Sequence, residues 1–282
     1  IFNKKRGILV TGTHGKTSTT AMIGRMMEDA DFDPMVLVGA TVCSWGKNAR
    51  VGKGEWMVAE GDEYQNKFLK LKPEVLVVTS IEHDHPDFFK TRKRYEEAFL
   101  TLITQLPPHG LIIAEKHLKK IIKKAPCPIV WYGIARRAEG RHMELNKEAA
   151  LSVARYTGVP AREARRSLNS YTGTARRMEF YTSASIPLVV IDDYAHHPTE
   201  IQTTLAAVRH RYPKRVITAL FQPHTYSRTH ELLSGFAKSF KHADEVILLP
   251  IYSSARERKD EYPPDLLLQL RKGILHAQKN IS

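Results

Sequence analysis

The sequence has few cysteines and no long apolar segment. Its 282 residues include only two cysteines, Cys43 and Cys127, which lie far apart in the chain. Two isolated cysteines argue against a disulfide framework and against a cysteine-rich zinc site, and they suit a reducing compartment. No apolar run approaches the roughly 18 residues of a membrane span, and the first residues, IFNKKRG, lack a signal-peptide pattern. We therefore expect a soluble, cytoplasmic protein.

Acidic residues are also comparatively scarce. The chain has 43 Lys and Arg against 30 Asp and Glu, which gives a formal net charge of +13. This balance favours anionic partners, such as nucleic acid, an acidic membrane surface or phosphorylated small molecules, and charge alone does not choose among them. The basic residues are scattered and are not interleaved with aromatic residues on one stripe. A small cluster such as KKIIKK, residues 119–124, therefore indicates a solvated helix face.

Length and composition indicate a globular protein of about two domains. Hydrophobic residues make up 42% of the chain, which is enough to bury a sizeable core. The first residue is Ile1 rather than Met, so we expect the sequence to be part of a longer protein.

Short apolar runs rich in β-branched residues alternate with segments of helical periodicity. The predicted strands lie at 7–11, 55–60, 74–81, 110–115, 128–133, 187–194, 215–221 and 245–252. The predicted helices lie at 91–106, 116–125, 143–158, 161–171, 198–212, 227–240 and 263–275. This alternation predicts an α/β fold, with a mostly parallel sheet in a first domain at 1–172 and a Rossmann-like second domain at 173–282. The boundary is expected at Thr172-Gly173, which ends the preceding helical segment.

The segment LVTGTHGKTSTTAM, residues 9–22, has the pattern of a P-loop. An apolar strand leads through Gly12 and Gly15 into a helix whose first N–H groups have no partner within the helix and whose dipole favours an anion. Lys16 is placed to neutralise the β- and γ-phosphates of a nucleotide, and Thr17 offers its hydroxyl to Mg²⁺. Valine stands where the usual pattern has its first glycine, so the loop is a shorter variant. The alternative is an ordinary strand-to-helix turn.

Polar residues follow two strands of the predicted first domain. Glu60 ends the run 55–60, and EHDHPD, residues 82–87, follows the run 74–81. Ligands of open parallel sheets bind beyond the carboxyl ends of the strands, so these residues are placed to meet the phosphates. A carboxylate oxygen of Glu60 and an imidazole of His83 or His85 are suitable ligands for a divalent metal. Such residues are most often simply solvated, and it is the neighbouring loop that favours metal contact.

The predicted second domain has a similar arrangement. IDDYAHHPTE places Asp193 and His196 after one apolar strand, and LFQPHTYSRT places His224 and Arg228 after the next. Two adjacent strand ends with Asp, His and Arg indicate a polar cleft for a carboxylate, a ribose or a phosphate. The alternative is that Asp caps the following helix and that the histidines are solvated.

Seven motifs, in order, together resemble the Mur ligases, the family that builds the peptide stem of peptidoglycan. TGTHGKTSTT is similar to the family's ATP loop, VAEGDE to its strand-end glutamate, and SIEHDHPD to its metal-associated histidine segment. GRHMELN, GTARRME, DDYAHHPTE and FQPHTYSRT are similar to the later motifs, and the resemblance extends from about residue 7 to residue 256. DDYAHHPTE and FQPHTYSRT are most similar to the family member that joins L-alanine to UDP-N-acetylmuramate.

The resemblance implies a set of site residues. The phosphates of ATP would be bound by Gly12, Thr13, His14, Gly15, Lys16, Thr17 and Ser18. One Mg²⁺ would be held by Thr17 and Glu60, and a second would be served by His85. Asn146 would approach the adenine, while Arg177 and Asp193 would reach the nucleotide from the second domain. His196 and Arg228 would lie near the muramyl carboxylate or the incoming alanine, so that the catalytic residues would be Lys16, Glu60, His85, His196 and Arg228.

The resemblance also implies a reaction and its partners. ATP would phosphorylate the lactyl carboxylate of UDP-N-acetylmuramate, and the amine of L-alanine would attack the acyl phosphate in peptidoglycan precursor synthesis. The enzyme would act in the cytoplasm as a monomer or homodimer, with no nucleic acid or membrane partner. Three alternatives remain open: a ligase of the same family that recycles a murein tripeptide, a basic P-loop ATPase that binds nucleic acid, and a binding-only pseudoenzyme.

Several positions depart from the family's pattern. Met143 stands where the family usually has Asn, and Thr225 stands where some members have arginine, which leaves Arg228 as the cation there. Only IARRAE, residues 134–139, separates WYG from GRH, where members have considerably more chain. The family's amino-terminal domain, which holds the UDP moiety, is not in the sequence, and we expect the carboxyl-terminal end to be short as well.

Overall fold

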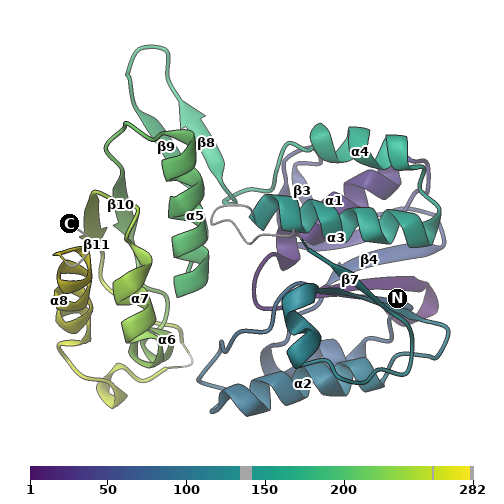
Figure 1. The fold of residues 1–282 in the computed structure, drawn as a ribbon, viewed down its shortest axis with the longest axis horizontal. Helices are drawn as coiled ribbons and strands as arrows, with labels where there is room; N and C mark the ends of the chain where they lie inside the picture. The colour runs from purple at the N-terminus through teal and green to yellow at the C-terminus, as the bar shows by residue number, and fades with distance from the viewer. Residues whose placement is uncertain (134–141, 256, 280–282) are drawn as a thin grey trace. The chain divides into compact units, whose positions relative to one another are not determined.

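The computed structural model describes residues 1–133, 142–255 and 257–279 of the chain. Figure 1 shows the elements that these residues form. The segment IARRAE and the first two residues of GRHMELN lie outside the described residues. Tertiary contacts group the rest into two compact parts: unit 1 comprises 1–83, 91–133 and 142–193, and unit 2 comprises 84–90, 194–255 and 257–279. The expected domain boundary at 172/173 remains a prediction.

Unit 1 is built on a seven-stranded sheet with the strand order β3-β2-β4-β1-β5-β6-β7. The strands are β1 (Arg6–Thr11), β2 (Met35–Val42), β3 (Lys47–Arg50), β4 (Trp56–Glu60), β5 (Val75–Val78), β6 (Leu111–Glu115) and β7 (Ile129–Tyr132). All neighbouring strands pair in parallel except β2 and β3, which are antiparallel. The central strands are buried on both faces, which explains why they are continuous apolar runs in the sequence. The predicted α/β fold with a mostly parallel sheet is confirmed.

Helices cover both faces of this sheet. Helices α1 (Lys16–Asp29), α3 (His142–Thr157) and α4 (Ala161–Asn169) pack on one another, and α2 (Arg92–Thr104) lies on the opposite face (Figure 1). Short 3-10 helices are formed by Phe2–Lys4, Tyr64–Lys70 and Lys116–Lys120. The helix predicted at 116–125 is therefore wrong in type and extent. Its lysines stand four residues apart as Lys119–Lys123 and Lys120–Lys124, and such like-charge pairs destabilise an α-helix.

The strands after residue 172 form two small sheets. Strands β8 (Glu179–Thr182) and β9 (Val189–Asp192) pair antiparallel within unit 1, and β10 (Thr218–Phe221) and β11 (Glu245–Leu248) pair in parallel within unit 2. The remaining elements of unit 2 are α5 (Pro198–Arg211), α6 (Tyr226–Glu231), α7 (Leu233–Ser239), α8 (Leu266–Lys279) and the 3-10 helix Lys259–Glu261. The single helix predicted at 227–240 is divided at Leu232, which links α6 to α7.

Each unit has its own apolar interior. In unit 1 the core joins buried residues of β1, β4 and β5 to the buried faces of α1, α3 and α4. In unit 2 Phe221 packs against Phe236 and Phe240, with ring centroids 5.6 and 5.3 Å apart. Cys43 and Cys127 form no disulfide. Among the described helices, none combines the length and apolar character that crossing a membrane requires.

Candidate active site

The loop after β1 approaches the neighbouring strand β5 too closely for any side chain at its first glycine. Gly12 has φ +134°, and a Cβ atom there would lie 2.2 Å from Thr79 Oγ1 and 2.7 Å from the Ser80 nitrogen. Gly15 has φ +79° and precedes α1, and a Cβ atom there would lie 2.7 Å from Asn146 Oδ1. Both positions favour glycine because their φ angles are positive, and at Gly12 the backbone of Ser80 also leaves no space for a side chain.

Hydrogen bonds tie the loop to the end of β5. The backbone N–H groups of Thr13 and His14 donate to the carbonyl and hydroxyl oxygens of Ser80, at 3.1 and 2.8 Å. The Thr13 hydroxyl donates to the Glu82 carbonyl and accepts from the Glu82 N–H, both at 2.8 Å. These bonds hold the loop at the carboxyl ends of the parallel strands, which we call the carboxyl edge of the sheet.

The ammonium group of Lys16 folds back over the loop. It donates to the carbonyl oxygens of Gly12 and Thr13, at 2.5 and 3.3 Å, and to the carboxylate Oε1 of Glu63 at 3.0 Å. Glu63 is buried, with 1% of its side chain exposed. The Tyr95 hydroxyl donates to the same oxygen at 3.1 Å. The loop lysine is thus held by a buried carboxylate as well as by the loop itself.

Sequence patterns identify Lys16 but miss its partner Glu63 and Tyr95, which donates to Glu63. Glu63 lies within the motif VAEGDE, in which the sequence analysis predicts a role only for Glu60. The position of Glu63, three residues after the glutamate at the end of the strand, is the sequence feature that could have indicated its role. Tyr95 lies inside a predicted helix, and its sequence context carries no signal of a site.

Thr17 and Glu60 come together beside the loop, as expected. The Thr17 hydroxyl donates to Glu60 Oε1 at 3.0 Å, and the other carboxylate oxygen accepts from the Gly39 N–H at 2.7 Å. A hydroxyl and a carboxylate are hard oxygen ligands, the kind that Mg²⁺ prefers. The donor set at this point therefore fits Mg²⁺.

The other residues predicted around the loop also lie in unit 1. Asn146 of α3 is buried next to Gly15, and its amide donates to the sulfur of Met143 at 3.9 Å. Ser18 is buried in α1, and His14 Nε2 lies 3.3 Å from Glu82 Oε2. The structure therefore brings residues 12–18, Glu60 and Asn146 to one end of the sheet.

A buried ion pair forms the centre of a second polar cluster, in unit 2. The guanidinium of Arg228 donates to both carboxylate oxygens of Asp84, at 2.7 and 3.2 Å, and each side chain is only 5% exposed. Burial alone would raise the pKa of Asp84, but the charge of Arg228 outweighs it and holds this pKa well below its usual value. Asp84 was not assigned a role from the sequence, because its partner lies 144 residues away.

Two histidines adjoin this pair. Arg228 Nη1 lies 3.2 Å from Nδ1 of His224, whose ring stacks on Tyr252 with centroids 5.1 Å apart and lies 5.9 Å from the ring of His196. Burial and then the positive charge of Arg228 lower the pKa of His224 to about 4. Burial also lowers the pKa of His196, against the opposing charge of Glu200. Both imidazoles are therefore neutral at pH 7.

Of the remaining predicted residues, His85 adjoins the Asp84–Arg228 pair. His85 follows Asp84 within unit 2, has φ +54°, and donates its backbone N–H to Asp84 Oδ1 at 2.7 Å. Arg177 and Asp193, expected to act from the second domain, are grouped with unit 1. There Asp193 Oδ2 accepts from the Met178 N–H at 2.8 Å. His197 accepts from the Thr199 N–H and so caps α5, whose predicted start at Pro198 is confirmed.

Comparison with protein families identifies both parts of the chain. Residues 10–164 match the Mur ligase middle domain, and residues 176–280 match the family described as Mur ligase, glutamate ligase domain. The chain belongs to the Mur ligase family. The loop, Thr17 and Glu60 lie within the first match, and His196 and Arg228 lie within the second.

Individual Mur ligases match most of the chain. The UDP-N-acetylmuramate–L-alanine ligase of Desulfitobacterium hafniense is 40% identical over 91% of this chain and 64% of its own length. The enzyme of the same name from Desulforamulus reducens is 35% identical over 90% of this chain and 63% of its own length. The chain thus spans a little under two thirds of the length of these curated relatives.

Solved structures of Mur ligases share the fold. The UDP-N-acetylmuramate–alanine ligase of Thermotoga maritima superposes with a TM-score of 0.74 at 23% identity, covering 97% of this chain and 65% of that one. A murein peptide ligase from Psychrobacter arcticus superposes with a TM-score of 0.66 at 21% identity, covering 98% and 67%.

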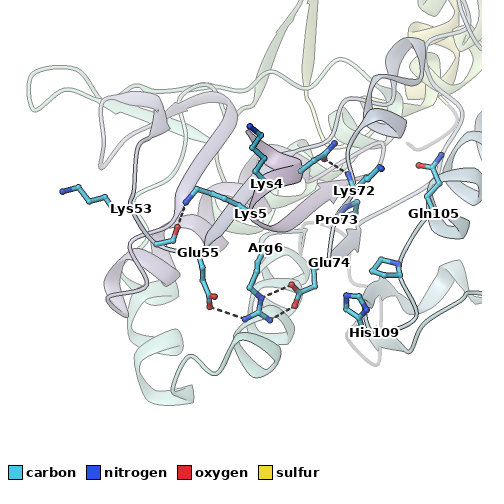
Figure 2. A pocket seen from close by; sticks show the side chains of 13 residues that line it. Lys4, Lys5, Arg6, Lys53, Glu55, Lys72, Pro73, Glu74, Gln105 and His109 are labelled. Carbon is cyan, nitrogen blue, oxygen red and sulfur yellow. Dashed lines mark hydrogen bonds and ion pairs between the residues drawn. The ribbon is translucent and has the colours of Figure 1, made fainter.

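The opposite edge of the Mur ligase sheet carries a different kind of polar surface. A groove of about 800 Å³ lies at the amino ends of the strands, which we call the amino edge, and its lining includes Lys4, Lys5, Lys53 and Lys72. Figure 2 shows Arg6 between Glu55 and Glu74 in this groove. Arg6 donates to both oxygens of Glu74, at 2.5 and 2.9 Å, and its guanidinium lies 4.0 Å from the ring centroid of Trp56. These contacts join the ends of neighbouring strands, which is a structural role.

Proposed function

We propose that this chain is the ATP-binding and carboxyl-terminal part of a UDP-N-acetylmuramate–L-alanine ligase. The observation that carries the proposal is the assembly of Lys16, Thr17 and Glu60 around the glycine loop of a Mur ligase sheet. The names of the curated relatives support the choice of substrates within the family. We also propose that the nucleotide-binding domain is 1–172 and the second domain 173–282, and that the enzyme acts in the cytoplasm.

The loop is the proposed site for the phosphates of ATP. The backbone N–H groups at the start of α1 and the ammonium of Lys16 attract negative charge, while the glycines let the backbone approach the phosphate oxygens. Asn146 beside Gly15 is the proposed contact for the adenine. Thr17 and Glu60 would hold Mg²⁺, with His85 as the proposed residue for a second ion, and this metal would neutralise part of the phosphate charge.

The proposed reaction has two steps. The lactyl carboxylate of UDP-N-acetylmuramate takes the γ-phosphoryl group of ATP, which forms an acyl phosphate and ADP. The neutral amine of L-alanine then attacks the acyl carbon, so that the amide bond forms, phosphate leaves and the amine gives up a proton. Two anions must approach each other in the first step, and the fixed positive charge of Lys16 reduces their repulsion.

Roles in this reaction are also proposed for residues of unit 2. The neutral imidazole of His196 and the guanidinium of Arg228 are proposed to lie near the muramyl carboxylate or the alanine. Asp84 already accepts from two nitrogens of Arg228, Nε and Nη2. Arg177 and Asp193 are proposed to contact the nucleotide.

Phosphate release by the whole protein tests this proposal. The protein is incubated with ATP, Mg²⁺ and UDP-N-acetylmuramate, and release is measured with L-alanine, with other amino acids or with a murein tripeptide. Release that depends on L-alanine supports the proposed ligase, and release that depends on the tripeptide supports a recycling ligase. Release stimulated by nucleic acid, or no release under any condition, would refute both.

A further inference from the structure

The ammonium group of Lys16 uses all of its hydrogen-bonding capacity within the protein. A lysine ammonium has three N–H donors, and Lys16 has three acceptors within reach: the carbonyl oxygens of Gly12 and Thr13 and the carboxylate of Glu63. A phosphate oxygen that accepts a hydrogen bond from Lys16 must therefore displace one of them.

Glu63 differs from the other two acceptors. The two carbonyls belong to the loop that carries Lys16, whereas Glu63 lies between β4 and the 3-10 helix Tyr64–Lys70. It is also the acceptor with a full negative charge, so a phosphate and this carboxylate repel each other while they attract the same ammonium. Of the three contacts, the one with Glu63 is the one that a nucleotide most directly opposes.

Hydrogen bonds hold the carboxylate in place from the other side. The hydroxyl of Tyr95, a fully buried residue of α2, donates to Glu63 Oε1 at 3.1 Å. Since a carboxylate only accepts, Tyr95 uses its single proton there, and its oxygen lies 2.9 Å from the Thr13 hydroxyl of the loop. Glu63 is therefore held by hydrogen bonds from both Lys16 and Tyr95.

We propose that Glu63 is a positioning residue that competes with the nucleotide phosphates for the ammonium of Lys16. This inference rests on the proposed function, because it takes the loop to be an ATP site. The carboxylate supplies the counter-charge that a mostly buried ammonium needs, keeps Lys16 folded over the loop, and gives up its hydrogen bond as phosphate is bound. Nucleotide affinity is then set by an exchange of one anionic partner for another.

The test is the affinity of the chain for ADP in the presence of Mg²⁺, measured by isothermal titration calorimetry. Glu63→Gln keeps the shape and an acceptor oxygen but removes the charge, so ADP should bind about 5- to 10-fold more tightly. Adenosine, which has no phosphate, should bind equally to both proteins. Glu115→Gln is the matched control, because Glu115 is a buried carboxylate of the same sheet that pairs with His117, and it should leave ADP affinity unchanged.

A double-mutant cycle tests whether the effect passes through Lys16. In a Lys16→Met background the gain from Glu63→Gln should fall below about 2-fold, because the ammonium over which the two anions compete is gone. An equal gain with and without Lys16 would assign the effect to direct repulsion of phosphate and overturn the proposal. Unchanged or weaker ADP binding by Glu63→Gln would overturn it as well.

Two further results keep this inference separate from the proposed function. If the unsubstituted chain binds neither ADP nor ATP, the ATP site itself is wrong. If it binds ADP and Lys16→Met weakens binding, but Glu63→Gln does not tighten it, only the competition is wrong. Should Glu63→Gln not fold, Glu63→Asp withdraws the carboxylate by one methylene, and tighter binding of ADP is again expected, whereas unchanged binding counts against the proposal.

Discussion

The two edges of the unit 1 sheet carry ion pairs that differ in their exposure to water. At the carboxyl edge, the Lys16–Glu63 pair has an N–O distance of 3.0 Å and side-chain exposures of 17% and 1%. At the amino edge, the Arg6–Glu74 pair has an N–O distance of 2.5 Å and exposures of 43% and 18%. Water screens the second pair far more than the first, so the charge of Lys16 acts strongly on a bound anion, whereas Arg6 and Glu74 contribute modestly to stability.

Unit 2 provides a third case. The Asp84–Arg228 pair is only 5% exposed on both sides and adjoins two neutral imidazoles. Because both partners are buried, removal of one of them should destabilise the protein strongly, since the other charge stays buried without a counter-charge. The three pairs show that the difference between them lies in burial rather than in contact distance. The buried pairs belong to the two candidate site clusters, and the exposed pair joins the ends of neighbouring strands.

Loss of the loop lysine should have the largest effect. Lys16→Ala is expected to lower ATP-dependent phosphate release by the whole protein about 100-fold or more, because the fixed charge beside the transferred phosphoryl group is gone. The far-UV circular dichroism spectrum should stay unchanged. Lys53→Ala, at the amino edge, is the matched control and should retain full activity. Near-normal phosphate release by Lys16→Ala would contradict the proposal that the carboxyl edge, and not the amino edge, binds the phosphates.

Breaking the buried pair of unit 2 should have the largest effect on stability. Asp84→Asn is expected to lower the free energy of unfolding by about 3 kcal/mol, since the guanidinium of Arg228 is left buried without its counter-charge. Urea unfolding followed by circular dichroism measures this. Asp260→Asn removes a pair whose partners are 74% and 69% exposed and should change stability by less than about 0.5 kcal/mol. Equal effects of the two substitutions would mean that burial does not decide the strength of these pairs.

The depressed pKa of His224 predicts a pH dependence of intermediate size. The folded protein keeps His224 neutral down to pH about 4, whereas the unfolded chain takes up a proton near pH 6.5. The unfolded state therefore binds more protons between these values, so stability should rise from pH 4 to pH 6.5. His224→Gln should reduce this rise by about 1.5 kcal/mol, after allowance for solvent screening of a partly exposed ring.

Urea unfolding at several pH values, compared between His224→Gln and the unsubstituted chain, measures this change. The charged and titratable neighbours of the ring are Arg228, His196, Glu257 and Asp84, and they are the same in both proteins. Identical pH dependence in the two proteins would contradict the assignment.

The smallest effect is expected at the amino edge. Glu74→Gln should destabilise the chain by about 1 kcal/mol, because Arg6 retains its contact with Trp56 and its second partner Glu55. Trp45, Trp56 and Trp131 all lie in unit 1, so tryptophan fluorescence during urea unfolding reports on this unit. Glu55→Gln, at the more exposed partner, is the control and should have an effect below about 0.5 kcal/mol. If Glu74→Gln lowered the free energy of unfolding by about 3 kcal/mol, the Arg6–Glu74 pair would be as strong as a buried pair, contrary to this expectation.

Sequence patterns predict the elements whose signal is local. The core strands β1, β5 and β6 are buried on both faces and are recognised as apolar runs, and the start of α5 is marked by its proline. Strand β3, KNAR, has no apolar alternation and is a strand because it pairs with β2, so no local pattern predicts it. The division of the helix at Leu232 likewise has no proline or glycine to mark it.

The same limit applies to the candidate site. The glycine loop is a contiguous segment, so the requirement for glycine at positions 12 and 15 and the proposed roles of Lys16 and Thr17 follow from the local sequence pattern. The partners of those residues come from distant parts of the chain: Glu63 is 47 residues from Lys16, and Asp84 is 144 residues from Arg228. A motif lists such residues without indicating which of them meet.

Local chemistry thus indicated a glycine loop at the end of a buried strand and the α/β alternation, because glycine conformation, helix dipoles and apolar periodicity act over a few residues. The family was indicated by the resemblance of seven sequence motifs. Tertiary packing alone decided which carboxylate holds Lys16, which one holds Arg228, and which ion pairs are shielded from water. The partner of each charged side chain depends on which distant segments pack together and on how deeply they are buried, and local sequence patterns specify neither.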